Sequence, residues 1–180
     1  MNGQQIEEFT ASISGFDLHR KYIGLSNIFL DADTLINNYN QGQTADHLSK
    51  LKCYKGYQME KDLVHRIQKV YGNKISFKDI LAFDNLVQGH PDFWYEEIIP
   101  GDCKSVLLDS HLPDDKLPRK VYWQVQGYML YGNAQKAIVI YESRESGRIR
   151  HRWVNRNEVI CREIQTKIET IIRSIQPVLA

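Results

Sequence analysis

Apolar positions recur at helical spacing in three parts of the chain. In residues 55–74 four apolar side chains stand at every fourth position, which predicts a helix that ends at Gly72. These side chains are Met59, Leu63, Ile67 and Tyr71. The preceding residues 42–52 also begin in a helical pattern, with Thr44 as the expected N-cap. A closing amphipathic helix is predicted over residues 157–175, with isoleucines at 160, 164, 168, 171, 172 and 175 on its apolar side.

Between these helices the pattern changes to that of strands. Strands are predicted at about 75–78, 85–95 and 98–108, followed by a polar loop and a helix that ends at Gly132. Residues 136–143 form a continuous apolar run, typical of a central strand, and residues 148–154 alternate with period two. A strand–helix–strand unit after Lys104 implies a parallel pair. The pattern therefore predicts an α/β fold in which a mixed central β-sheet is flanked by α-helices.

Composition limits the possible protein classes but does not indicate a function. The chain has 180 residues, 42% hydrophobic and 25% charged, which favours a single domain over residues 1–180. A formal net charge of +1 means that a nucleic-acid site would be a local patch. The three cysteines are far apart and no CxxC occurs, so zinc knuckles are not supported and a reduced, cytoplasmic setting is expected. We expect no signal peptide and no membrane partner, because the N-terminal residues lack a basic start and no apolar stretch is long enough to span a bilayer.

The stretch GHPDFWYEEIIPGDCKSV, residues 89–106, is predicted to form a hairpin yet carries three charged side chains at inner positions. Because side chains alternate along a strand, Asp102 and Lys104 share one face while Cys103 points to the other. Asp92 lies across the hairpin, where it can approach Asp102. Two carboxylates brought this close repel each other, so one should be protonated unless a cation intervenes.

A divalent metal would be a suitable cation, because Mg²⁺ binds one or two carboxylates together with phosphate oxygens and water. Lys104 would then orient an attacking water or stabilise charge that develops on a phosphate. The structural alternative is an ion pair between Lys104 and either aspartate on a solvated face.

Glu60 borders the apolar stripe of the 55–74 helix. A glutamate beside a buried stripe is costly without a partner. It is either a third acidic metal ligand or a solvated residue that pairs with Lys55 or Lys61.

A similar ambiguity concerns the helix after the hairpin. Lys120, Gln124 and Tyr128 repeat every fourth position next to an apolar stripe. Gln124 and Tyr128 either line the site, where they touch DNA or metal-bound water, or belong to an ordinary exposed polar face.

Taken in order, these residues form a known motif set. Pro91-Asp92 followed by Asp102-Cys103-Lys104 resembles the PD-(D/E)XK nuclease superfamily, and the form is most similar to its RecB-like and lambda-type exonuclease branch. In that branch a helical Gly-x-x-x-Glu precedes the hairpin and a helical Gln-x-x-x-Tyr follows it. The corresponding segments are GYQME, GHPDF and QVQGY, and YIGLSNIF is similar to the N-terminal Gly-x-Ser segment. The matches extend over about residues 20–145.

The resemblance implies a restriction-endonuclease-like core and a Mg²⁺- or Mn²⁺-dependent deoxyribonuclease. Its implied metal ligands are Glu60, Asp92, Asp102 and the backbone carbonyl of Cys103. Lys104 would position the water nucleophile, and Gln124 and Tyr128 complete the catalytic set. Ser26, together with Arg20, would lie near a DNA phosphate.

Three functions remain open from the sequence. The expected one is a DNA exonuclease of recombination, repair or phage-like replication, with a homo-oligomer or a recombination protein as possible partners. The others are an endonuclease of restriction or mobile-element type and a non-catalytic nucleic-acid-binding module. The third is disfavoured because every motif position is filled. Asp102 stands where glutamate is commoner, the iron–sulfur cysteines of some relatives are missing, and no helicase motif is present.

Positive charge is concentrated near the end of the chain. Residues 144–156 contain five arginines and one glutamate, and Arg148, Arg150 and Arg152 share one strand face. Such a row is suited to phosphate contacts, although charged edge strands also protect against aggregation. Arg119 and Lys120, at the start of the Gln124 helix, are the stronger candidates for contact with substrate.

Overall fold

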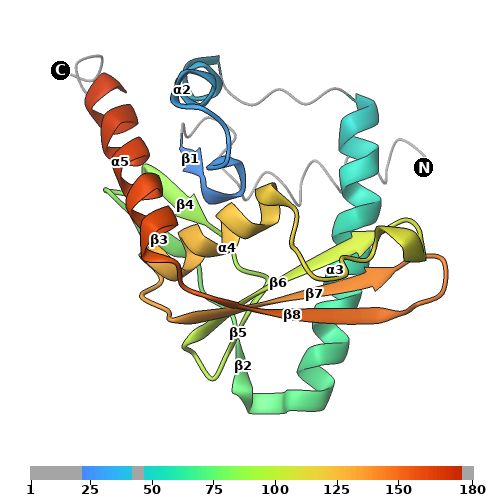
Figure 1. The fold of residues 1–180 in the computed structure, drawn as a ribbon. Helices are drawn as coiled ribbons and strands as arrows, with labels where there is room; N and C mark the ends of the chain where they lie inside the picture. The colour runs from blue at the N-terminus through green and yellow to red at the C-terminus, as the bar shows by residue number, and fades with distance from the viewer. Residues whose placement is uncertain (1–21, 42–46, 176–180) are drawn as a thin grey trace.

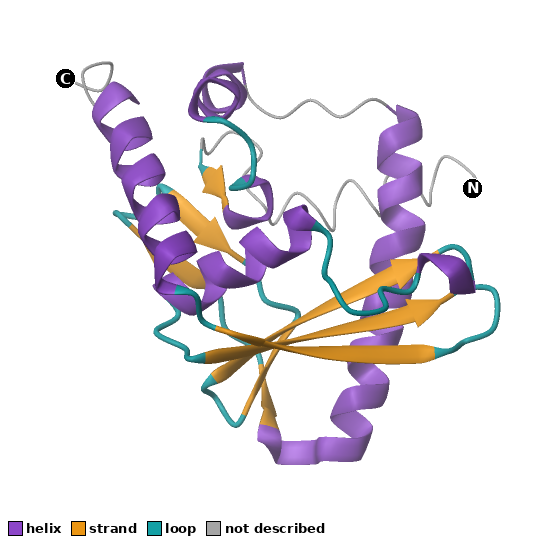
Figure 2. Ribbon diagram, in the orientation of Figure 1, coloured by secondary structure: helices purple, strands orange, loops and turns teal. Residues whose placement is uncertain are grey.

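The computed structural model describes residues 22–41 and 47–175, which form an α/β protein (Figures 1 and 2). The helices are α2 (Ala32–Gln41), α3 (His47–Tyr71), α4 (Arg119–Tyr131) and α5 (Glu158–Ile175). The strands are β1 (Ile23–Gly24), β2 (Ile75–Ser76), β3 (Ile80–Ala82), β4 (Val87–Gly89), β5 (Phe93–Tyr95), β6 (Ile99–Val106), β7 (Lys136–Ser143) and β8 (Ile149–Asn155). Three short 3₁₀ helices are η1 (Leu25–Asn27), η2 (Gly72–Lys74) and η3 (Asp109–His111).

The strands form two sheets. The larger sheet has the order β2-β5-β6-β7-β8, in which only the β6–β7 pair is parallel. The smaller sheet has the order β1-β4-β3. The mixed sheet and its parallel pair agree with the pattern of the sequence, because a helix crossover returns the chain parallel to the strand it left. The apolar strand β7 lies inside the larger sheet, and the arginine-bearing β8 forms its edge.

Helices cover both faces of the larger sheet. Figure 1 shows α4 lying over one face, with α5 and the smaller sheet beyond it, and α3 crossing the other side. The main core lies on the α4 side and includes Val125, Val139 and Ile164. A second cluster joins Leu63 of α3 to the opposite face of the sheet, where Cys103 is also buried. The alternation predicted for β6 therefore holds, since Cys103 faces α3 while its neighbours face α4.

The helices follow the predicted stripes. Helix α3 ends at Tyr71, where Gly72 adopts a positive φ of 56° that favours glycine. It begins at His47 and combines the two helical patterns read from the sequence into one element, while the expected cap Thr44 lies outside the described residues. Helix α5 buries the isoleucines of its apolar side, with Ile160 only partly covered.

The single strand expected over 85–95 is wrong. The chain pairs as β4 in the smaller sheet, leaves it at Gly89, and enters the larger sheet as β5 only at Phe93. Pro91 has no backbone N–H to donate to a ladder, so pairing stops around it. The Asp92 amide then donates to the carbonyl of Gly101 at 2.9 Å. Asp92 therefore stands where the chain crosses between sheets.

Gly101 allows the hairpin to close tightly. It pairs with Phe93 across the β5–β6 ladder, and a Cβ at this position would lie 2.1 Å from the Phe93 ring. Phe93 is itself almost fully buried, and its ring also lines a hollow of about 340 Å³ beside α3. Glycine therefore permits the close contact beside Asp102, and a larger residue would force the Phe93 ring or the hairpin to shift.

No helix among residues 22–41 and 47–175 combines the length and apolar character needed to cross a membrane.

Candidate active site

The charged side chains of the hairpin meet at the face of β6 that looks toward α4. Lys104 Nζ lies 2.7 Å from Asp102 Oδ2, and both residues stand on the same face of the strand. Asp92 reaches the same strand from the crossover, because its Oδ2 accepts a hydrogen bond of 2.5 Å from the Cys103 amide. The Cys103 carbonyl lies 3.4 Å from Lys104 Nζ. Two acids and one base are thereby held beside the same segment of β6, residues 102–104.

Burial strongly perturbs this group. Asp102 is 1% exposed. Removal from water raises the pKa of Asp92 to about 7, and the negative charge of Asp102 adds to the effect. Burial also raises the pKa of Asp102, against the influence of Lys104. Burial alone would lower the pKa of Lys104, but the carboxylates of Asp102 and Asp92 outweigh it, so this pKa is raised and the amine stays charged.

Glu60 approaches the same group from α3. Its pKa is raised by burial and by the charge of Asp102, while the charges of Lys104 and Arg144 and the Ser105 amide lower it. These interactions place the Glu60 carboxylate near the end of β6. Glu60 is partly buried and shares the electrostatic environment of the hairpin acids, while the side chain of Lys55, one of its two alternative partners, lies outside the described residues.

Helix α4 contributes two polar side chains that contact the site. Gln124 Nε2 donates to Asp102 Oδ1 at 3.0 Å and to the Tyr128 hydroxyl at 2.6 Å. Tyr128 in turn donates to the His90 carbonyl at 3.2 Å, which ties the helix to the strand crossover. Both side chains are buried, so the alternative of an exposed polar face is wrong. The three bonds form one chain from the crossover to Asp102.

Lys120 and Ser26 are two further candidates from the sequence. The charge of Lys120 lowers the pKa of Asp102, which places this amine within electrostatic range. Ser26 is exposed on η1, and the neighbouring Leu25 packs so closely on Gly89 that a Cβ there would lie 2.6 Å from the Leu25 side chain. Arg20 lies outside the described residues.

Other positive residues are directed elsewhere. The Arg119 guanidinium stacks over Trp123, 5.4 Å from the ring centre, on the side toward α5. Arg148 lies 3.7 Å from an Asp109 oxygen, Arg150 lies 2.5 Å from Asp114, and Arg152 donates to the Pro113 carbonyl at 3.2 Å. The arginine row thus holds the loop between β6 and α4 against the sheet edge.

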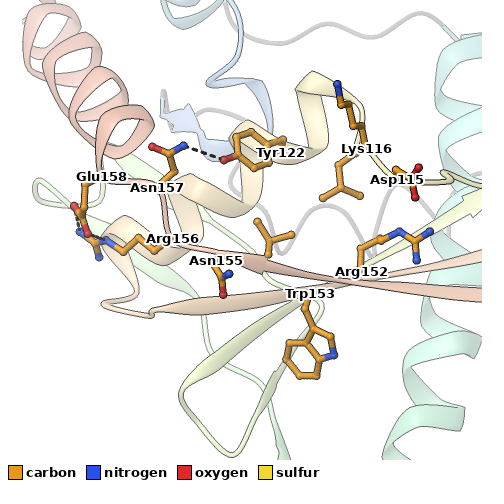
Figure 3. Close-up of a pocket in the computed structure, with 11 residues that line it drawn as sticks. Asp115, Lys116, Tyr122, Arg152, Trp153, Asn155, Arg156, Asn157 and Glu158 are labelled. Carbon is orange, nitrogen blue, oxygen red and sulfur yellow. Dashed lines mark hydrogen bonds and ion pairs between the residues drawn. The ribbon is translucent and has the colours of Figure 1, made fainter.

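Arg152 also lines an open hollow of about 740 Å³ between this loop, β8 and the start of α5 (Figure 3). Its polar groups largely bond to one another: Arg156 lies 2.7 Å from Glu158, and Asn157 donates to the Tyr122 hydroxyl at 3.3 Å. Trp153 points to the opposite side of the strand (Figure 3). This hollow is separate from the carboxylate site.

The residues present fit a hard divalent cation in their chemistry. Their free donors are carboxylate oxygens, which Mg²⁺ and Mn²⁺ prefer, and Asp102 Oδ2 is buried without a hydrogen bond from any described residue. The same oxygen lies 2.7 Å from the Lys104 ammonium, so a bound cation would share it with this ion pair. Within the described part of the chain, no three His, Cys, Asp or Glu side chains are gathered tightly enough to form a metal centre as they stand. The ligand set therefore remains a prediction.

No family model matches the sequence, and no curated protein matches it significantly. Solved structures do match. An alkaline exonuclease, LHK-Exo from Laribacter hongkongensis, superimposes with a TM-score of 0.69 at 14% identity, over 95% of this chain and 93% of that one. A phage-related exonuclease from Haemophilus somnus 129PT gives 0.67 at 10% identity, over 91% and 97%.

The chain has the fold of these exonucleases. At such low identity the likeness concerns the fold alone, and the chemistry rests on the residues described above. The sequence did not single out Arg144 within the arginine-rich segment, although the structure brings its charge to Glu60. Nothing in the spacing of the arginines distinguished it from its neighbours.

Proposed function

We propose that this chain is a divalent-metal-dependent nuclease that hydrolyses DNA phosphodiester bonds, and that it removes nucleotides from strand ends. The observation that carries the proposal is the buried Asp102, bonded by Gln124 and paired with Lys104, in a fold shared with solved exonucleases. A buried, paired acid–base cluster of this kind is costly for a purely structural role.

In this proposal Glu60, Asp92, Asp102 and the Cys103 carbonyl hold Mg²⁺ or Mn²⁺. The metal would supply charge neutralisation at the phosphate and a more acidic bound water. The carboxylates of Asp102 and Asp92 raise the pKa of Lys104, which favours its ammonium form. In this form Lys104 acts as a fixed cation that orients the attacking water and offsets charge on the phosphate oxygens.

Gln124 and Tyr128 position the carboxylates through hydrogen bonds. Gln124 fixes Asp102 in one orientation, and Tyr128 fixes Gln124 and the crossover that carries Asp92. Much of the catalytic effect would come from such positioning, because phosphoryl transfer needs little covalent chemistry from the protein.

Solved structures with the same fold support removal of nucleotides from strand ends. Both are named as exonucleases, and LHK-Exo was also solved in complex with dAMP. A nucleoside monophosphate is the unit that stepwise removal from an end releases. A homo-oligomer or a recombination protein as the partner that directs this activity stays a prediction from the sequence.

The test is cleavage of linear and closed circular DNA, with Mg²⁺, Mn²⁺ or EDTA, by wild type, Lys104→Ala and Lys136→Ala. Lys136 is an exposed lysine at the start of β7 and serves as the matched control. We expect metal-dependent digestion of linear DNA alone, slowed on the order of 10²-fold in Lys104→Ala and unchanged in Lys136→Ala. Nicked circles would indicate an endonuclease. Binding without cleavage under any metal would indicate a non-catalytic module.

A further inference from the structure

The five arginines between residues 144 and 156 differ in what they contact. Four of them have partners outside the carboxylate site. Arg148 forms an ion pair with Asp109, while Arg150, Arg152 and Arg156 donate to Asp114, the Pro113 carbonyl and Glu158. Arg144 has a different environment, because it follows directly after β7 at the end that adjoins β6. Position along the sheet, and not spacing in the sequence, separates it from the rest.

The backbone fixes where Arg144 begins. Ser143, the last residue of β7, is in register with Val106 of β6, and the Arg144 amide donates to the Val106 carbonyl at 2.8 Å. Lys104 lies only two residues earlier on β6. The side chain of Arg144 therefore starts at the open end of the strand that carries the catalytic candidates.

The side chain then turns toward the site. Arg144 Nε donates to Ser105 Oγ at 2.7 Å, and that hydroxyl also lies 3.5 Å from the Met59 sulfur, next to Glu60. The positive charge of Arg144 lowers the pKa of Glu60, against the larger effect of burial. Both observations place the guanidinium beside the acid that α3 contributes.

The anchor leaves the outer edge of the guanidinium available. Among the described residues neither Nη atom of Arg144 has an acceptor, and the side chain is exposed. A guanidinium held through Nε presents two parallel N–H groups, which match two oxygens of a phosphate.

We propose that Arg144 binds a backbone phosphate of the nucleic-acid strand held in the site, with Ser105 orienting its guanidinium. The inference rests on the proposed function, because it assumes a nucleic-acid substrate. It names a specific contact that the arginine-rich segment alone did not identify, and it assigns to Arg144 the role of a substrate-binding residue.

The test is equilibrium binding of a labelled DNA oligonucleotide in EDTA, over a series of salt concentrations, so that neither metal nor cleavage enters. Wild type is compared with Arg144→Gln, Arg144→Lys, Arg148→Gln and, as the matched control on α5, Arg162→Gln. Loss of one phosphate contact should reduce the slope of log K against log salt by roughly 0.7–0.9 and weaken binding on the order of tenfold at low salt. Arg144→Lys should keep part of the affinity, and Arg162→Gln should match wild type.

Each alternative outcome is distinguishable. An unchanged salt slope in Arg144→Gln, with reduced cleavage in Mg²⁺, would mean that Arg144 acts only through Glu60 and overturns the contact. Equal losses in Arg144→Gln and Arg148→Gln would mean a diffuse field and would also overturn it. Wild type that binds but never cleaves would refute the nuclease proposal while the binding result still decides on Arg144. Wild type that binds no nucleic acid would refute both.

Discussion

The side-chain amide of Gln124 donates to Oδ1 of Asp102 across 3.0 Å and so joins helix α4 to strand β6. Its second N–H donates to the Tyr128 hydroxyl, so a rotated Gln124 amide could not keep both hydrogen bonds. The carboxylate is therefore held in one orientation, with Oδ2 facing Lys104. A buried carboxylate fixed from one side presents its other oxygen to a substrate-side cation in a constant geometry.

Replacing Gln124 with Leu should therefore impair cleavage more than folding. Single-turnover cleavage in Mg²⁺ should slow on the order of tenfold or more, because Asp102 loses its orienting bond. Gln126, two residues along, is the contrast: its amide bonds the Asn155 carbonyl and the Asn157 amide, so Gln126→Leu should lower the melting temperature more. The interpretation fails if the two variants show the same ratio of activity loss to stability loss.

The raised pKa of Asp92 predicts an unusual dependence of stability on pH in metal-free protein. Its value of about 7 in the folded state against 3.8 as the reference means that the folded protein binds the extra proton between these values. Stability should therefore fall as pH rises from about 4 to about 7. Asp92→Asn removes this proton equilibrium and keeps an oxygen for the Cys103 amide.

Unfolding by urea in EDTA at several pH values checks this expectation. Asp92→Asn should be more stable than wild type above pH 7, by roughly 2–4 kcal/mol, and close to it near pH 4. Asp115→Asn, on the exposed loop before α4, is the control. Parallel pH curves for wild type and Asp92→Asn would show that the carboxylate is not perturbed as described.

Glu60→Gln tests the role of α3 in the site. Burial and Asp102 raise the pKa of Glu60, so removing its charge should leave the melting temperature in EDTA the same or higher. Cleavage should nevertheless be largely lost if Glu60 holds metal, and calorimetric titration with Mn²⁺ should show weaker binding. Full cleavage by Glu60→Gln would return this residue to a structural role.

Gly101→Ala tests the packing that brings Asp92 beside Asp102. The added Cβ would lie 2.1 Å from the buried Phe93 ring, so the ring or the hairpin must shift, and we expect a loss of roughly 2 kcal/mol. Cleavage should fall with stability, because the hairpin acids move apart. Gly147→Ala has open space around its Cβ, and any smaller effect there should come from its positive φ of 70°. Equal stability of the Gly101 variant and wild type would contradict the tight closure.

Local sequence determined the elements and the face of each residue within them. The stripe of α3, the isoleucines of α5 and the alternation of Asp102, Cys103 and Lys104 all depend on the helical and strand periods, which act between near neighbours. The same logic predicted the parallel β6–β7 pair from its helical crossover. The motif order supplied the candidate site residues, and the structure brings the side chains of Glu60, Asp102, Lys104 and Gln124 together.

Only the tertiary structure decided which charges meet. The break at Pro91 sends β4 and β5 into different sheets, and this crossover, which a continuous strand would not provide, carries Asp92 to β6. Likewise, the spacing of the five arginines in residues 144–156 does not distinguish them. The contacts of each one depend on the loop or strand end that it faces. Partners of this kind lie far apart in the chain, so their choice depends on packing and burial rather than on local period.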